Sequence, residues 1–534
     1  MSKFKKLGIL LALLILVSAA AFGVTRYEEK QEEIRSSNDT ILSIDPETVT
    51  ALSWEYEDTS LSFHRDSDWS YDEDDAFPVS EDAIDQLLET FRSFDVAFTI
   101  DQVSDFGQYG LDDPACRISL TADGQDYELL LGDYSTLDSE RYVSIGDGKV
   151  YLAVSDPMDT FEVQLSDMIL NDDIPDVFNA DQVVFSGSEN YTITCEEDSD
   201  RSWCAEDIYF TDEGPLDTTE VHSYLTSLSY VPLTDYASYN VTEEELAAWG
   251  LDDPELTVTV TYTPETGSEA ADGAEESSAA EETADPVTFT VSIGRNREEL
   301  AAWEAAEAEK AEEAEEAEKA ESEAADAAEA DDEADTEDAE DAEELTVTAY
   351  IRLNDSPIVY ILSDSSYQSL TEASYNDLRH DELMTASFSD ITQIDISLDD
   401  EIYTINSELV ETESEDSEED EEDTDEVQYT RIWHYTDTEA LDISAFQQSV
   451  SGLTAASFTE EAPTDQEEVC ITFYLDNEAF PQITLALYRY DNTYCLAAVN
   501  GESIALVSRS DVVDLIESVY AIVLPQTETG GTNE

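Results

Sequence analysis

Hydrophobic and polar residues in the first part of the chain follow patterns that predict strands and then a helix. Residues 49–56 alternate with a period of two, and residues 61–64 continue the alternation after a turn, so these stretches predict an antiparallel pair of strands. Residues 69–71 predict a third short strand beginning at Trp69. Apolar residues then recur at helical spacing behind Ser80, which is placed to cap the helix. This predicted stripe consists of Ile84, Leu87, Leu88, Phe91 and Phe94.

An aromatic residue followed by Gly-Leu-Asp-Asp-Pro stands at 109–114 and again at 249–254. The glycine permits a left-handed turn, and the proline biases the residue before it toward extended geometry. Each copy precedes a β-rich run, so the motif predicts a turn that leads into a strand. Because the motif occurs twice, we interpret the chain as a repeat protein. The residues assigned to this structural turn are Gly110, Asp112, Asp113, Pro114, Gly250, Asp252, Asp253 and Pro254.

The second copy has the features of the first in the same order. Phe-Pro-Val-Ser at 77–80 corresponds to Gly-Pro-Leu-Asp at 214–217, which keeps the proline and exchanges one capping residue for another. The apolar residues that follow have the same i, i+3, i+4, i+7 spacing as the first stripe. They are Val221, Tyr224, Leu225 and Leu228. Trp203 stands where Trp69 stood, and three later strands also have counterparts.

A third, degenerate copy is predicted from about Phe388 to Leu524. Trp433 marks its third strand, and Asp442 is expected to cap a helix. The Gly-Leu-Asp-Asp-Pro turn is missing, and an acidic linker takes its place. The apolar residues of the capped helix are Phe446, Val450 and Leu453. A final helix over 512–522 is expected to pack through Val513, Ile516 and Val519 or their neighbours.

These patterns predict an α+β protein built from tandem modules, each an antiparallel sheet with a helix, after an N-terminal transmembrane helix. The predicted segments are an anchor at 1–26, a juxtamembrane stalk at 27–40, module 1 at 41–170, module 2 at 171–380, module 3 at 386–524 and a disordered tail at 525–534. Acidic insertions are predicted at 265–285 and 298–344 in module 2 and at 408–426 in module 3. We expect them to be solvated and to form a coiled coil or a partly helical, partly disordered protrusion, and they have no apolar stripe that would dock a helix.

The N-terminal segment decides the expected location of the protein. Residues 7–24 are apolar and uncharged, and lysines precede them, so they predict a single-pass membrane anchor with the body outside the cytoplasm. The small residues at 18–21 offer the alternative of a signal peptide cleaved near Ala21, which would release the protein.

Charge excludes one class of partner. The chain has 131 Asp and Glu residues against 21 Lys and Arg, a formal net charge of -110 over 534 residues. A surface this acidic repels phosphate, so nucleic-acid binding is excluded and membrane attachment has to be local and hydrophobic. Weak binding of divalent cations to the acidic runs stays open.

No catalytic pattern stands out. The four histidines are scattered, and neither a metal-ligand motif, a phosphate loop nor a nucleophile elbow occurs, so we expect no enzyme activity, cofactor or metal site. The aspartates of the two turns have two interpretations, a pair of carboxylate sites or side chains that bond the turn backbone, and the second is the commoner. The tryptophans are interpreted as core or hairpin-edge residues, not as a sugar platform.

The five cysteines leave two possibilities open. Cys195 could form a disulfide with Cys204, and Cys470 with Cys495, if the compartment is oxidising. Alternatively all are reduced, buried thiols, and Cys116 is single in either case.

Taken together, the tryptophan strand, the proline-preceded helix and the glycine turn resemble a family of membrane-anchored bacterial envelope proteins that contain a domain of unknown function. The resemblance covers residues 41 to about 378. Members are often encoded beside ABC-type transporter subunits of the gliding-motility kind, and the family has no assigned catalytic residues. The resemblance implies a non-enzymatic, extracytoplasmic accessory or binding protein with a transporter as partner. The alternatives are a released or surface-displayed acidic protein that binds cations or adheres, and a hydrolase using clustered carboxylates.

Overall fold

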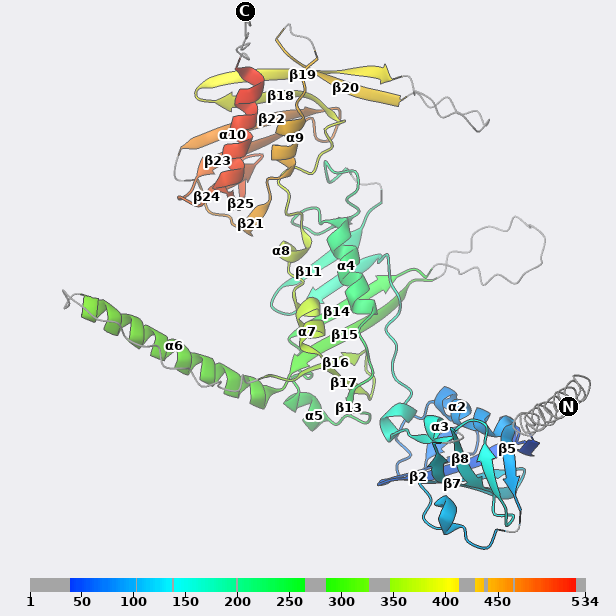
Figure 1. Cartoon of the computed structure of the whole chain (residues 1–534). Coiled ribbons are helices and arrows are strands. Elements are labelled where there is room, and N and C mark those ends of the chain that lie inside the picture. Colours follow the sequence, from blue (N-terminus) through cyan, green and yellow to red (C-terminus); the bar gives the residue numbers. More distant parts are fainter. Residues whose placement is uncertain are drawn as a thin grey trace, which may run out of the picture. The chain divides into compact units, whose positions relative to one another are not determined.

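The computed structural model describes residues 39–101, 103–136, 139–197, 200–264, 285–325, 346–412, 428–436, 440–463 and 466–524 (Figure 1). The predicted anchor, the stalk up to residue 38, the tail from residue 525 and large parts of the acidic insertions lie outside these residues. Within the described ranges, no helix combines the length and the apolar composition that crossing a membrane requires.

The first sheet has nine strands in the order β1-β5-β9-β8-β7-β6-β2-β3-β4. These are β1 (Asp39–Leu42), β2 (Val49–Tyr56), β3 (Thr59–Arg65), β4 (Trp69–Tyr71), β5 (Phe94–Ile100), β6 (Cys116–Ala122), β7 (Gln125–Ser135), β8 (Glu140–Ser144) and β9 (Val150–Ala153). The helical segments are η1 (Pro46–Thr48), α2 (Glu81–Arg92), η2 (Gly107–Tyr109), α3 (Met158–Phe161) and η3 (Leu165–Met168).

The predicted cap and stripe of α2 are confirmed. The Ser80 hydroxyl accepts a hydrogen bond from the backbone N–H of Ala83 at 3.2 Å. The buried residues of the helix are Ile84, Leu87, Leu88 and Phe91. Burial of each side chain stabilises by roughly 1.5–3 kcal/mol, against about 1 kcal/mol for a cap, so packing dominates over capping. Phe94 is also buried, but it lies in β5 and not in the helix.

The second sheet has eight strands in the order β12-β11-β10-β14-β15-β16-β17-β13. These are β10 (Gln182–Ser186), β11 (Asn190–Cys195), β12 (Tyr209–Phe210), β13 (Tyr236–Ser238), β14 (Leu256–Tyr262), β15 (Val287–Arg295), β16 (Ala349–Leu353) and β17 (Val359–Leu362). The helices are α4 (Thr218–Ser229), α5 (Glu243–Ala248), α6 (Arg297–Ala325), α7 (Asp364–Thr371) and α8 (Tyr375–Leu378). The predicted cap and stripe of α4 are confirmed, because Asp217 accepts from the N–H of Thr219 at 2.7 Å and all four apolar residues are buried.

The third sheet has eight strands in the order β20-β19-β18-β22-β23-β24-β25-β21. These are β18 (Ile391–Leu398), β19 (Glu401–Thr412), β20 (Gln428–Tyr435), β21 (Ala455–Phe458), β22 (Glu467–Leu475), β23 (Gln482–Arg489), β24 (Tyr494–Val499) and β25 (Glu502–Ser508). The helices are α9 (Ser444–Ser451) and α10 (Arg509–Val523). Asp442 bonds the backbone N–H of Ser444 at 2.9 Å, so it acts at the start of α9, as expected.

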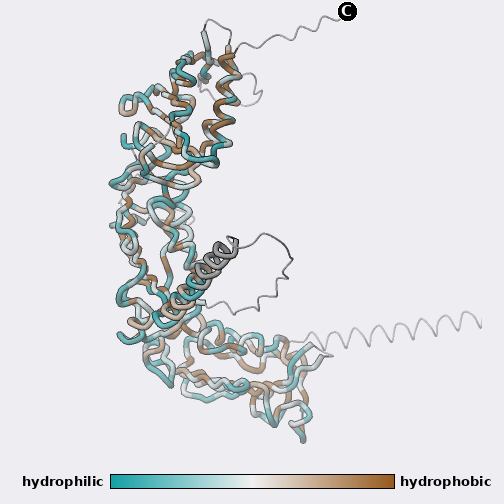
Figure 2. The backbone as a smooth tube through the Cα atoms, turned by 90° about the vertical axis from the view of Figure 1, so that its left-hand side faces the viewer, coloured by the Kyte–Doolittle hydropathy of each residue, from teal (hydrophilic) through white to brown (hydrophobic). Residues whose placement is uncertain are grey.

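The three sheets have one strand order. In each, an interior strand (β2, β10 or β18) is followed by two strands that run outward to one end, and the strand after the helix (β5, β13 or β21) lies near or at the other end. In the first sheet an additional strand, β1, occupies that other end. Neighbouring strands pair in antiparallel fashion, for example Leu52 with Leu120 and Ile396 with Ile471. Figure 2 shows brown and teal stretches alternating along the chain, as expected for sheets with one buried face. The shared order fits the predicted repeat, and descent from one unit stays an inference.

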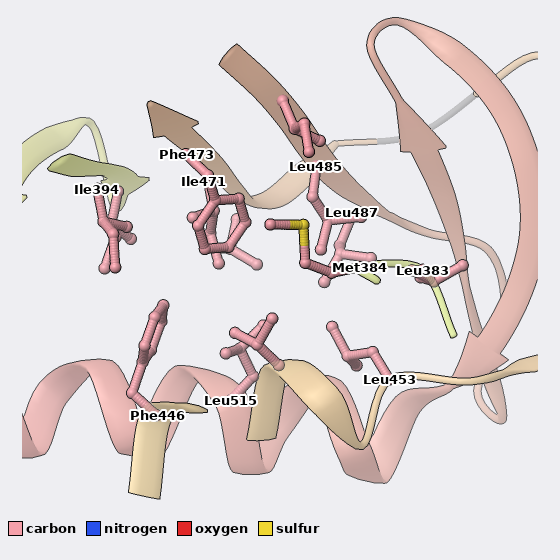
Figure 3. Close-up of a cluster of buried hydrophobic side chains, with 14 of the residues drawn as sticks. Leu383, Met384, Ile394, Phe446, Leu453, Ile471, Phe473, Leu485, Leu487 and Leu515 are labelled. Carbon is pink, nitrogen blue, oxygen red and sulfur yellow. The ribbon is translucent and has the colours of Figure 1, made fainter. Parts of the chain in front are cut away.

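The third sheet packs its core against α9 and α10. Figure 3 shows Phe446, Leu453 and Leu515 facing side chains of the sheet such as Ile471, and Met384 lies among them. The buried core begins at Leu383, three residues before the predicted boundary at 386. Of the predicted contact residues of α10, Val519 is buried, whereas the neighbours Val512 and Leu515 are buried in place of Val513 and Ile516. Val513 is 40% exposed.

One acidic insertion is partly helical, as predicted, and the boundary of another differs from the prediction. Helix α6 covers Arg297–Ala325, so this part of the Ala/Glu segment is helical, and its residues 301–312 are almost all exposed. Residues 408–412 of the third acidic stretch belong to β19 and pair with residues 428–432 of β20. The β-branched Val410 and Thr412 suit a strand, and the acidic composition concealed it.

Contacts divide the chain into two compact units. One contains the described residues up to Asp173 with Pro232–Leu246 and Asp355–Ile361, and the other contains Ile174–Val231, Ala247–Asn354 and the described residues from Leu362. The second unit therefore holds most of the second sheet and all of the third.

Candidate functional site

The two glycine turns are built in the same way. Gly110 (φ 70°) and Gly250 (φ 72°) both have left-handed backbone conformations. Each turn packs against a second glycine in the following hairpin. A Cβ atom on Gly132 of β7 would lie 2.1 Å from the Tyr109 carbonyl oxygen, and one on Gly294 of β15 would lie 2.6 Å from the Trp249 carbonyl oxygen. Only glycine allows backbone to approach backbone so closely.

The aromatic residue that opens each motif has an equivalent partner in both sheets. Tyr109 packs on Tyr142 of β8 with ring centroids 5.0 Å apart, and Trp249 stacks on Tyr350 of β16 at 4.8 Å. The leucines that follow the glycines, Leu111 and Leu251, are buried. The motif therefore packs against β7 and β8 in the first sheet and against β15 and β16 in the second.

The aspartates of the turns do not carry the expected backbone hydrogen bonds. All four side chains are exposed. Within the described part of the chain, Asp252 alone among them has a side-chain partner, Arg297 at 2.7 Å. Exposed pairs of this kind contribute about 0–1 kcal/mol. The prediction that the motif is structural fits this geometry, although glycines and aromatics carry it, not carboxylates.

In the structure all five cysteines are free thiols, which is the second of the two possibilities left open by the sequence. Cys470 lies in β22 and Cys495 in β24, and β23 separates these strands. Two strand spacings are about 9.5 Å, beyond the roughly 7 Å limit for bridged Cα atoms. Cys495 also faces the core, while Cys470 is half-buried on the opposite face. Cys195 ends β11, and Cys204 lies in the segment before β12.

The histidines have separate partners. His64 Nδ1 lies 2.6 Å from Asp72, and His222 stacks on Phe178 with centroids 4.4 Å apart. The hydrogen bond with Asp72 raises the pKa of His64, whereas burial lowers the pKa of His222.

We expect the pKa of His64 to lie above the reference value of 6.5 and to fall toward it in Asp72→Asn. A raised pKa in the folded state means that protonated His64 stabilises the protein at low pH. That contribution is lost as pH rises through the folded-state pKa. NMR titration of the imidazole Cε1 proton measures both values, and an unchanged pKa in Asp72→Asn would refute the assignment.

The fourth histidine, His380, lies among carboxylates contributed by distant segments. We call Cys204, Asp207, Asp217, His380 and Glu382 the His380 cluster. His380 Nε2 lies 2.7 Å from Asp207 Oδ1, and its Nδ1 lies 3.4 Å from Asp217 Oδ2 and 4.0 Å from Glu382 Oε2. Burial disfavours the charged imidazole, but the hydrogen bond with Asp207 and the surrounding carboxylates outweigh this and raise the pKa of His380.

Asp207 is the buried centre of the His380 cluster. Its side chain is 1% exposed. The Ser202 hydroxyl donates to Asp207 Oδ2 at 2.6 Å, which leaves Oδ1 for His380. The Ser202 oxygen also accepts from the backbone N–H of Cys204 at 3.0 Å, so Cys204 and Asp207 belong to one ordered turn. A buried carboxylate requires such partners, because an unpaired buried charge is strongly destabilising.

The His380 cluster lies where the second sheet meets the third. Between Cys204 and Ser202, Trp203 donates from Nε1 to Thr385 Oγ1 at 2.9 Å and contacts Phe480 edge-on, with centroids 5.9 Å apart. On the other side, Glu382 forms an isolated β-bridge with Thr454. Trp203 is therefore not the third-strand residue equivalent to Trp69, but a half-buried contact with the third core.

Two shallow hollows lie elsewhere. One, of about 230 Å³, is lined by residues of β2, β6 and β7 such as Ser53 and Thr121, and the other, of about 390 Å³, by Gln164, Tyr236 and their neighbours. Neither is lined by a histidine, cysteine, lysine or arginine, so neither combines a nucleophile with a histidine base.

Comparison with known families gives one match. A family profile described as a domain of unknown function (DUF4340) covers residues 69–254, from the start of β4 to the proline of the second glycine turn. This confirms the resemblance to a domain of unknown function over that span, which includes both glycine turns. No curated protein and no solved structure is significantly similar to the chain.

Proposed function

We propose that the protein is a non-enzymatic accessory or binding component of the bacterial envelope. The apolar segment 7–24 anchors it in the membrane, and its body lies outside the cytoplasm. Its partner is a protein, and the resemblance described above favours an ABC-type transporter.

The observation that supports a protein partner is a two-stranded ribbon in the third sheet. Strand β18 pairs with β19 only as far as Asn406, whereas β19 and β20 stay paired to Thr412 and Gln428. We call residues 407–412 with 428–433 the β19–β20 ribbon, which extends from the sheet in Figure 1. The equivalent end strands of the other sheets, β4 and β12, have three and two residues.

This ribbon has the properties of a docking edge. Leu409 is 52% and Val410 36% exposed, and adjacent strand residues point to opposite faces. Among the described strands, β20 ends the sheet beside β19, and the described contact on its outer edge is the isolated bridge of Trp433 with Leu441. A two-stranded ribbon is marginally stable alone, so an added partner strand would stabilise it and cover the apolar side chains. The glutamates Glu408 and Glu411 favour a partner strand with basic residues.

Affinity capture of the full chain from detergent-solubilised membranes tests the proposal. We expect a transporter subunit to be recovered with the native protein, and we expect the recovered amount to fall about tenfold with Leu409→Ser/Val410→Ser. Val287→Ser is the matched control, because Val287 is also a strand residue and is 41% exposed. Equal recovery with both variants would exclude the ribbon as the docking site.

Location is tested by fractionation and N-terminal sequencing of the same protein. An intact N-terminus in the membrane fraction supports the anchored protein. A mature chain beginning near Phe22 in the medium would replace it with the released, cation-binding or adhesive alternative. A hydrolytic activity that is lost on substitution of clustered carboxylates would instead establish the hydrolase alternative.

A further inference from the structure

The side chains around His380 Nε2 form a set of metal ligands. A thiol sulfur, a carboxylate oxygen and an imidazole nitrogen, from Cys204, Asp207 and His380, all lie within 4.8 Å of one another. We infer that these three residues bind one zinc ion. This site would be independent of the proposed protein partner.

The ligand types favour zinc over the hard cations. Zinc accepts cysteine, histidine and aspartate, whereas calcium and magnesium take oxygen ligands. Tetrahedral zinc with ordinary bond lengths separates its ligand atoms by roughly 3.3–3.6 Å. The imidazole nitrogen and the Asp207 oxygen would therefore separate slightly from their present 2.7 Å. Zinc would replace the proton on Cys204 Sγ, which is released, while the imidazole would bind through Nε2 and keep a proton on Nδ1, facing Asp217.

The surrounding residues already hold these ligands in place. Asp217 lies 3.4 Å from His380 Nδ1, and a carboxylate behind a metal-binding histidine fixes the ring and strengthens it as a ligand. Ser202 holds the second oxygen of Asp207 at 2.6 Å. Three protein ligands leave a fourth position for water or an added group.

The other face of the imidazole is a weaker candidate. Asp217, His380 Nδ1 and Glu382 also lie close together, but the Glu382 side chain is 48% exposed and no thiol is present there. The simplest alternative to a metal is a protonated His380 held between Asp207 and Asp217. These three possibilities require different residues, so variants separate them.

Titration of the purified full chain with Zn²⁺ and Co²⁺ tests the inference. Excess Mg²⁺ should be present to occupy the many surface carboxylates, because it competes poorly for a thiolate. We expect one tight equivalent of Zn²⁺, and a thiolate-to-metal charge-transfer band with Co²⁺. Zn²⁺ should also protect Cys204 from alkylation, measured by peptide mass spectrometry, with half-buried Cys470 as the internal control.

Variants identify the ligands. Cys204→Ser should remove the charge-transfer band and the tight equivalent, and Cys470→Ser should keep both. Asp217→Asn keeps a good helix-capping side chain and should weaken binding 10- to 100-fold without abolishing it. Circular dichroism of the metal-free proteins shows whether each variant folds. If a variant misfolds, the Co²⁺ charge-transfer band of the native protein still tests the site. The zinc site would be overturned if the native protein bound no tight equivalent of Zn²⁺, or if its Co²⁺ complex lacked the charge-transfer band. It would also be overturned if binding were lost in Asp217→Asn/Glu382→Gln but kept in Cys204→Ser.

Discussion

Replacing Gly132 with alanine destabilises the first sheet by about 3 kcal/mol, because the new Cβ meets a backbone oxygen that cannot move alone. The contact would be 2.1 Å, to the carbonyl of Tyr109, and Leu111 lies only 3.0 Å away on another side. To relieve this clash, β7 would have to separate from the glycine turn, which positions β6. Hydrogen exchange of the β6 and β7 amides under increasing denaturant measures the loss locally, without assuming that the whole chain unfolds in one step.

Gly124→Ala is the matched control. Gly124 is in the β6–β7 hairpin turn at φ 74°, and a Cβ there would meet nothing within 4 Å. Left-handed strain alone costs about 1–2 kcal/mol. Because Gly132 does not have a left-handed backbone, equal destabilisation of the two variants would contradict the larger loss expected from the close contact. Gly294→Ala should repeat the result in the second sheet, because its Cβ would lie 2.6 Å from the Trp249 carbonyl oxygen.

Phe446→Ala destabilises the third sheet by about 3–5 kcal/mol, since it removes a fully buried aromatic side chain and leaves a cavity. Phe446 is 0% exposed, and its ring lies edge-on to Phe388 with centroids 6.5 Å apart. The same side chain fixes α9 against the strands in Figure 3. Faster exchange of the β18 and β22 amides reports the change.

Val513→Ala in the same layer should change stability by less than about 0.5 kcal/mol, because Val513 is 40% exposed. A comparable loss in both variants would mean that α10 packs through the face predicted from the sequence. A loss confined to Phe446→Ala would confirm the observed face.

Much of the fold follows from local patterns. The caps Ser80 and Asp217 and the two apolar stripes behind them were predictable, because an amphipathic helix depends on spacing within four residues. The face of α10 was not, since apolar residues at 512, 513, 515, 516 and 519 fit two phases of a helix. Tertiary packing selects between such phases.

The candidate site was hidden from sequence reasoning for a different reason. Asp207 and His380 are 173 positions apart, and no motif relates them. The sequence indicates Cys204 only as a possible disulfide partner, although Cys-x-x-Asp in a turn is a signal for a metal ligand pair. The partner of Asp207, His380, is supplied by a distant segment, and a single sequence does not reveal that contact.

The shared strand order also determines when each sheet can assemble. The interior pairs, such as β2 with β6 and β18 with β22, join strands separated by a hairpin, a helix and an end strand. Closure of such long loops is slow, and it cannot begin before the later strand is available. If the chain crosses a membrane as an extended polypeptide, each sheet can mature only after its own second half has emerged, so the order of translocation becomes the order of folding.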